Sequence, residues 1–168
     1  KKLLRIFSLH LWPEVSQHER MNKKIIPNEI LFSEIRKIIA SGKEAVFRVK
    51  GRSMLPFLKG DCDCVRLGPP ANIQVGDILL FESTPGHFIL HRLVAIEGEI
   101  FVFMGDGNCY GREKCQRSHI IGKVNAVIRE NGKEVDCNSV SERRKARIWR
   151  WLLPVRRYLL AIRRRLYE

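Results

Sequence analysis

The chain has 168 residues, enough for one domain with a sizeable core, and its 45% apolar content is ordinary for a globular protein. Its net charge of +13 is concentrated at one end, because residues 141–168 carry ten basic and two acidic side chains. A nucleic-acid-binding domain favours a basic folded body, so the nearly balanced remainder of the chain argues against nucleic acid as a partner of that body.

The first 26 residues differ in character from the rest, and we expect them to be disordered or to lie upstream of the natural start. Their short apolar run over residues 6–12 is followed by Pro13 and charged residues, and it is far shorter than the ~20 residues of a membrane span. The next segment predicts a helix that begins near the N-cap Asn28 and ends at Gly42. Its apolar face consists of Leu31, Ile35, Ile38 and Ile39.

Strands and turns alternate from Ala45 to about Asp136, which predicts a mostly β body over residues 27–140. Turns that contain glycine or proline separate short apolar segments, as is typical of antiparallel hairpins. The expected strands cover residues 45–50, 62–67, 78–81, 88–96, 100–104, 120–129 and 134–135. Short strands joined by regular turns favour a compact β-barrel or a coiled sheet.

Residues 141–168 predict a basic amphipathic helical tail, with Ser141 as a candidate cap and Pro154 as an interruption. Trp149 and Trp151 lie next to its apolar face, as interfacial aromatic residues often do. That face consists of Val155, Tyr158, Leu159, Ile162 and Leu166. The tail is too charged to cross a membrane, so it lies on an anionic membrane surface, packs back on the body, or binds an acidic partner or nucleic acid.

The segment Gly51-Arg52-Ser53-Met54-Leu55-Pro56 places a serine on a turn directly after an alternating strand. A serine hydroxyl is a weak nucleophile at neutral pH and needs a neighbouring group that accepts its proton. Two polar groups follow in order, His91 at the end of an apolar run and Asp106 in the segment Gly105-Asp106-Gly107-Asn108. Because an imidazole accepts protons near neutral pH, this order predicts an activated serine with a base and an acid from separate elements.

Five segments in this order resemble the signal peptidase I superfamily, which includes the SOS-repressor self-cleavage domains. The resemblance covers about residues 45–128 and rests on Gly51-x-Ser53-Met54-x-Pro56, Gly76-Asp77-Ile78, His91-Arg92, Gly105-Asp106-x-Asn108 and Ile121-Gly122-Lys123-Val124. The histidine followed by arginine is similar to the endoplasmic-reticulum and archaeal type, in which histidine stands in place of a lysine base. The resemblance implies a compact coiled sheet or barrel of the signal peptidase type. It also implies Ser53 as nucleophile, His91 as general base and the Ser53 backbone N–H as an oxyanion donor.

The chain departs from the pattern of the superfamily at two positions. Histidine-type enzymes carry an aspartate a few residues after the Gly-Asp segment, where this chain has Gly111-Arg112-Glu113. We predict Asp106 as the third catalytic residue, with Glu113, or a dyad without a third member, as alternatives. Some relatives place a hydroxyl two residues before the nucleophile, but Gly51 stands there, and loss of such a donor typically lowers the rate by about 10²- to 10³-fold.

The sequence therefore predicts a serine endopeptidase that cleaves a signal or leader peptide without a cofactor or metal. The peptide would bind as an added strand with small side chains near the scissile bond, and Met54 and Pro56 are the predicted substrate contacts.

Five cysteines, an odd number, predict reduced thiols, and their spacing matches no familiar zinc pattern. Two alternatives remain, an inactive peptide-binding barrel and a basic membrane-surface protein. The expected location is the cytoplasm or the membrane periphery, with residues 141–168 as the membrane contact.

Overall fold

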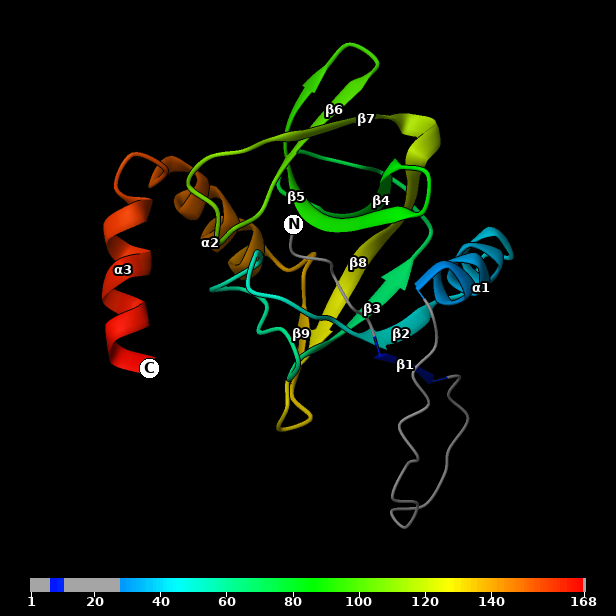
Figure 1. Ribbon diagram of the computed structural model, residues 1–168, viewed down its shortest axis with the longest axis horizontal. Coiled ribbons are helices and arrows are strands. Elements are labelled where there is room, and N and C mark those ends of the chain that lie inside the picture. The colour runs from blue at the N-terminus through cyan, green and yellow to red at the C-terminus, as the bar shows by residue number, and fades with distance from the viewer. Residues whose placement is uncertain (1–6, 11–27, 168) are drawn as a thin grey trace.

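The computed structural model describes residues 7–10 and 28–167. Within these residues one antiparallel sheet forms the body, and three α-helices lie around it (Figure 1). The strands are β1 (Phe7–His10), β2 (Ala45–Arg48), β3 (Cys64–Gly68), β4 (Ile78–Thr84), β5 (His87–Glu97), β6 (Ile100–Met104), β7 (Glu113–Gln116), β8 (Ile120–Ile128) and β9 (Glu134–Asp136). The helices are α1 (Asn28–Ala40), α2 (Val140–Trp151) and α3 (Arg156–Tyr167), with a short 3-10 helix at Arg117–His119.

The strands follow the order β1-β2-β3-β8-β4-β5-β6-β7, and β9 pairs with β8. In the described part of the chain β1 and β7 do not pair, so the sheet is β-rich as predicted but is not closed into a barrel. β8 joins its two halves, because it pairs with β3 over residues 123–128 and with β4 over residues 120–123. It also carries β9, with Val127 opposite Val135.

Two strands differ from the sequence-based prediction. β1 lies in the segment that we expected to be disordered or upstream, and it pairs antiparallel with β2, with Leu9 opposite Phe47. The rest of residues 1–26 lies outside the described residues. β7 was not predicted, because the segment Glu113-Lys114-Cys115-Gln116 contains only one apolar residue. β7 lies at the edge of the sheet, where β6 is its one partner among the described strands.

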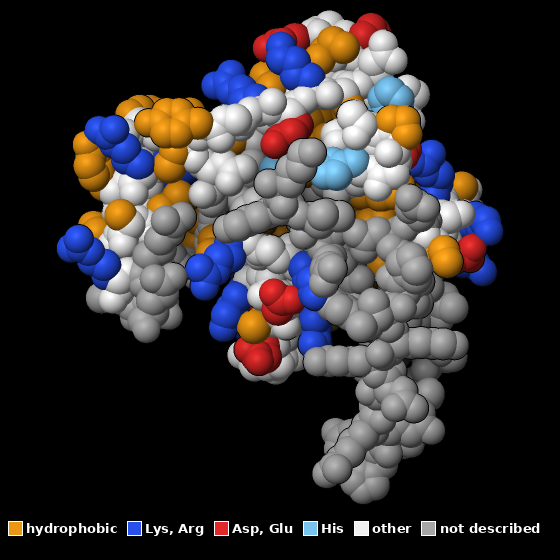
Figure 2. Space-filling view, in the orientation of Figure 1, with side chains coloured by type: hydrophobic (Ala, Val, Ile, Leu, Met, Phe, Trp, Pro, Cys, Tyr) orange, Lys and Arg blue, Asp and Glu red, His pale blue; other side chains and the backbone are white. Residues whose placement is uncertain are grey.

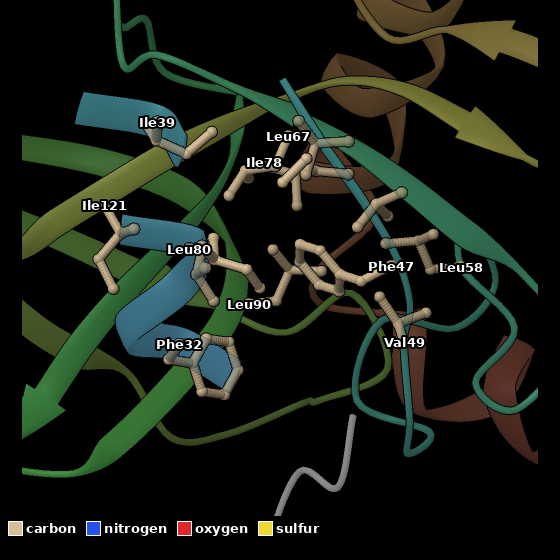
Figure 3. Close-up of a cluster of buried hydrophobic side chains, with 14 of the residues drawn as sticks. Phe32, Ile39, Phe47, Val49, Leu58, Leu67, Ile78, Leu80, Leu90 and Ile121 are labelled. Carbon is tan, nitrogen blue, oxygen red and sulfur yellow. The ribbon is translucent and has the colours of Figure 1, made fainter. Parts of the chain in front are cut away.

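Two apolar clusters lie on opposite faces of the sheet, and β4 contributes to both. Ile78 and Leu80 join the first cluster with α1, whereas Leu79 and Phe81 face the second, because successive side chains of a strand point to opposite faces. The predicted helix is confirmed as α1, and Figure 3 shows its residues Phe32 and Ile39 directed into the first cluster. Buried α1 residues are Leu31, Phe32, Ile35 and Ile39.

The two C-terminal helices differ in how they contact the body. α2 begins at the N-cap Ser139, whose hydroxyl accepts a hydrogen bond from the Glu142 N–H, and not at the predicted cap Ser141. α2 packs against the body through the buried Ala146, so this part of the tail docks intramolecularly. α3 lies beyond α2, away from the sheet (Figure 1). In the described part of the chain, no helix combines the length and apolar character that a membrane crossing requires.

Candidate active site

Ser53 lies on a loop of residues 49–63 whose two ends are held together. The Val49 N–H donates to the Asp63 carbonyl oxygen (3.2 Å), and the Asp61 N–H donates to the Val49 carbonyl oxygen (2.8 Å). The chain crosses itself between Gly51 and Gly60, where a Cβ added to Gly60 would lie 2.0 Å from the Gly51 carbonyl oxygen. Glycine is therefore required at this crossing for steric reasons.

The interior of the serine loop is anchored in the core. Met54 and Leu58 are 6% and 1% exposed, so the turn that carries Ser53 sits on buried side chains. At the loop end, the Asp63 carboxylate accepts hydrogen bonds from the Lys59 N–H (2.8 Å) and from Arg129 Nη1 (2.7 Å). These contacts hold the position of Ser53 independently of any substrate.

His91 lies on β5 and is bonded to an acidic residue of β7. Its Nδ1 is 2.9 Å from Oε2 of Glu113, and its side chain is buried, at 7% exposure, while that of Glu113 is 28% exposed. An ionised carboxylate can only accept, so in the neutral imidazole a hydrogen bond from Nδ1–H to Glu113 leaves Nε2 with a free lone pair. Nε2 is the nitrogen that can take a proton from a nucleophile.

The Nε2 atom of His91 lies next to Gly105, and the backbone of the serine turn also approaches Gly105 closely. A Cβ added to Gly105 would lie 2.5 Å from the Ser53 carbonyl oxygen, 2.7 Å from Asn108 Nδ2 and 3.0 Å from His91 Nε2. Three polar groups from separate segments thus converge on the space that glycine leaves open. The Ser53 carbonyl oxygen and the His91 ring thus lie on either side of Gly105, and the pairing of Ser53 Oγ with His91 stays a prediction.

The turn after β6 packs directly on the serine turn. The Gly107 N–H donates to the Ser53 carbonyl oxygen (2.7 Å), and a Cβ on Gly107 would lie 2.6 Å from the Arg52 carbonyl oxygen. Both glycines of the segment Gly105-Asp106-Gly107-Asn108 are therefore needed for close backbone approach. This contact sets the distance between the serine loop and the β5 strand that carries His91.

Ser53 itself is half-buried and borders a small hollow of about 230 Å³, measured out to open solvent. Among the described residues, no hydrogen bond joins Ser53 Oγ to His91. Among the described residues the Ser53 backbone N–H has no hydrogen-bond partner, so it is free to donate to an oxyanion; its role as an oxyanion donor stays a prediction. Catalytic hydrogen bonds are often long in proteins without bound substrate, and rotation about the Ser53 Cα–Cβ bond moves Oγ without moving the loop.

Asp106 does not contact the imidazole, so our prediction of its role requires correction. Its carboxylate forms a fork with Arg92, with Nε 2.8 Å from Oδ1 and Nη2 2.6 Å from Oδ2, and both side chains are buried. Arg92 Nη1 also donates to the Gly76 carbonyl oxygen (2.6 Å). The group that orients His91 is Glu113, the alternative that the sequence left open, and Asp106 holds together the segments around the site.

The two predicted substrate contacts lie in different places. Met54 is buried and forms part of the wall of the hollow beside Ser53. Pro56 borders a separate hollow together with Val135 of β9 and Glu142 of α2, and Ser53 does not line that hollow. Pro56 therefore does not line the hollow beside Ser53, whereas the buried Met54 does.

Sequence reasoning did not assign Trp149 and Arg156 to the site, although both hold its glycine turn. Trp149 Nε1 donates to the Asp106 carbonyl oxygen (2.9 Å). Arg156 is 2% exposed, and its Nη1 donates to the Asn108 carbonyl oxygen (3.2 Å) while its Nη2 donates to the Trp149 carbonyl oxygen (2.9 Å). The only sequence signal was aromatic and basic residues in the tail, which a solvated amphipathic helix would also contain.

Comparison with known proteins adds no relative. No protein-family model, no curated protein and no solved structure matches the chain. Within the described residues, no group of three or more His, Cys, Asp and Glu side chains is arranged to hold a metal ion. The five cysteines are free thiols. The chemistry of the site therefore has to be argued from its own side chains.

Proposed function

We propose that the protein is a serine endopeptidase of the signal peptidase type, which cleaves an extended leader or signal peptide. The observation that carries this proposal is the environment of His91. Its Nδ1 is paired with the Glu113 carboxylate, and its Nε2 lies beside Gly105, where the Ser53 carbonyl oxygen also lies. A general base beside a serine nucleophile requires Nε2 within hydrogen-bond reach of Oγ, and the position of Nε2 near the serine turn supports that role for His91.

In the proposed reaction, Ser53 Oγ attacks the carbonyl carbon of the scissile peptide, and its proton passes to His91 Nε2. The Ser53 N–H stabilises the oxyanion, and Glu113 stabilises the imidazolium through Nδ1–H. His91 then delivers the proton to the leaving amine nitrogen, which departs and leaves an acyl ester on Ser53. A water molecule, deprotonated by His91, hydrolyses this ester and restores the hydroxyl.

The hollow beside Ser53 supports a substrate with a small apolar side chain near the scissile bond. Its walls are mainly apolar or backbone, contributed by Val49, Gly51, Met54, Leu58, Gly60 and Leu90. Lys50 also lines the hollow. Only about 10 Å³ of this space admits the centre of a water-sized sphere, about enough for one water molecule, so a large side chain is excluded and even an alanine-sized group requires its walls to move apart.

The direct test is covalent labelling with a fluorophosphonate together with cleavage of a leader peptide. We expect the protein to label at Ser53, and Ser53→Ala to remove both labelling and cleavage. His91→Ala should lower kcat by about 10²- to 10⁴-fold, the typical contribution of a general base. Ser118→Ala and His119→Ala change the same residue types at exposed positions and should retain full activity.

One observation favours a second candidate function, a peptide-binding module without catalysis. The absence of a Ser53–His91 hydrogen bond among the described residues is what an inactive barrel-like domain would also show. This candidate gains support if the protein binds leader peptide with unchanged affinity in Ser53→Ala while fluorophosphonate never labels Ser53. Labelling at Ser53 that requires His91 would exclude it.

A further inference from the structure

The tail presents an exposed apolar face on α3 and the end of α2. Of the eleven exposed large hydrophobic side chains in the described residues, seven lie between Val140 and Ile162. Five of them form what we call the docking face: Trp151, Val155, Tyr158, Leu159 and Ile162. Trp151 is 82% exposed and Ile162 is 56% exposed, so much of this face is open to solvent in the described chain. Tyr158 contacts its neighbour Arg157, which donates to its hydroxyl and lies 4.5 Å from its ring centroid. Figure 2 shows hydrophobic and basic side chains together on this lobe of the molecule, at the left of the view.

A positively charged hollow adjoins the docking face at Trp151. We call it the arginine hollow. It measures about 740 Å³ out to open solvent, and its lining is Val94, Met104, Arg112, Arg147, Arg150, Trp151, Leu153 and Arg156. No acidic side chain lines it, and within the described residues none of its four arginines forms an ion pair.

Among the described residues, the arginines of the hollow have no ion-pair partner, although Arg156 donates to two carbonyl oxygens. Burial, followed by the nearby charges of Arg92 and Arg147, lowers the pKa of Arg150. Arg156 is almost fully buried, and its Nε has no hydrogen-bond partner. A buried donor without an acceptor and several arginines without an ion pair make this hollow complementary to an anion with several oxygen atoms.

We propose that the docking face and the arginine hollow together bind the surface of an anionic phospholipid bilayer. Phosphate groups of the lipids occupy the hollow, while the apolar side chains of the docking face enter the interfacial region. The combination of exposed aromatic and aliphatic side chains with adjacent arginines favours a bilayer over nucleic acid, which offers phosphates but no apolar layer.

Docking would place the candidate active site at the lipid surface. Trp149 and Arg156, which belong to the same two helices, are hydrogen-bonded to the turn of Asp106 and Asn108. A peptide whose leader is embedded in or lies on the bilayer would then meet the serine loop without diffusion through solution. The docking itself does not depend on the proposed hydrolysis, and its test uses no catalytic readout.

The experiment is co-sedimentation of the full chain carrying Ser53→Ala with two kinds of vesicle. One kind is phosphatidylcholine alone, and the other contains one part phosphatidylglycerol to two parts phosphatidylcholine. We expect binding to the anionic vesicles, little binding to the neutral ones, and a decline as salt is raised. Trp emission should shift to the blue on binding, and Trp151→Phe should remove most of that shift.

Matched variants separate the two parts of the surface. Ile162→Ser should weaken binding about tenfold, whereas Ile30→Ser, at 57% exposure on α1, should leave it unchanged. Arg147→Gln and Arg150→Gln should each weaken binding about fivefold. Lys59→Gln and Lys133→Gln remove the same charge from exposed positions on the body and should have a smaller effect.

The proposal would be overturned by equal binding to neutral and anionic vesicles, or by docking-face and arginine variants that bind no more weakly than their controls. Displacement from vesicles by inorganic phosphate, beyond the effect of chloride at the same ionic strength, would instead identify a free-anion site. Tighter binding of duplex DNA than of anionic vesicles, with loss in the same arginine variants, would identify a nucleic-acid surface.

Discussion

At the scale of single residues, the site depends on which carboxylate faces the imidazole. Glu113 lies on β7, and His91 on β5, so the intervening strand β6 has to end before the two side chains can meet. β6 does end at Met104, opposite Arg92 and just before Gly105. Asp106, although nearer in sequence to the glycines, is held by Arg92. The acidic residue of β7 is thus paired with the imidazole, and the acidic residue of the turn after β6 is paired with Arg92.

We expect Glu113→Gln to lower kcat by about 10- to 100-fold with little change in KM or stability. A hydrogen bond to a charged group contributes about 1.5–3 kcal/mol, and the amide cannot stabilise the imidazolium that forms in the transition state. Steady-state kinetics on a leader peptide and a urea unfolding curve measure the two effects. Glu99→Gln, an exposed position on the turn between β5 and β6, is the matched control.

Asp106→Asn should show the opposite pattern, with a loss of stability of about 3–5 kcal/mol, because it leaves Arg92 charged and buried without its partner. If Asp106→Asn lowered kcat and left the unfolding curve unchanged, Asp106 would be the third catalytic residue, as the sequence predicted.

The sequence could not decide between the two carboxylates, because β7 has no apolar alternation that would have placed Glu113 on a strand.

At the scale of elements, the glycine turn after β6 is held from two sides. The serine loop contacts it through the Gly107–Ser53 hydrogen bond, and α2 contacts it through Trp149. Trp149 also packs edge-on against Phe57 of the serine loop, with ring centroids 6.0 Å apart. The C-terminal helices are thus part of the support of the site and not an independent appendage.

Trp149→Phe tests this support, because it keeps an aromatic ring and removes the Nε1–H donor. We expect a loss of about 1 kcal/mol in unfolding free energy and a measurable fall in kcat, since the Asp106 carbonyl oxygen loses its partner. Trp151→Phe makes the same change two residues later at an exposed position and should alter neither quantity. Equal behaviour of the two variants would show that α2 does not stabilise the turn.

Element types were easier to predict than contacts between elements. Alternation and turn residues predicted most of the strands, and the apolar spacing from Leu31 to Ile39 predicted α1. The docking of Trp149 and the burial of Arg156 were missed, because a basic helix has the same pattern whether its arginines are solvated or pack on carbonyl groups. β1 was missed because its pairing partner, β2, is more than thirty residues away in sequence.

At the scale of the whole molecule, the two apolar clusters shield some ionisable groups from water. Burial raises the pKa of the Cys115 thiol, and that of the Cys137 thiol, from the ordinary value of 9.0 to about 11. Cys115 belongs to the second cluster, and Cys137 packs against the first. Neither thiol takes part in the proposed reaction, so both report on folding alone.

We expect these two thiols to make stability fall as the pH rises from about 9 to about 11. In this range the unfolded chain releases thiol protons that the folded chain retains, so deprotonation favours unfolding, and below about pH 9 the stability contribution is complete. Urea unfolding at a series of pH values measures the decline, and a double variant, Cys115→Ala with Cys137→Ala, should show a smaller one. Identical pH dependence in both proteins would contradict the assignment.

The pairing of β8 has a consequence for how the molecule reaches its fold. β8 is the shared partner of β3, β4 and β9, and β3 precedes it in the chain by more than fifty residues. Until Ile120–Ile128 has been synthesised, the strands on either side lack the neighbour that unites them. Such long-range closure is entropically costly and slows folding relative to chains with local contacts. A nascent chain is therefore exposed to chaperones and proteases until β8 has been synthesised and can pair.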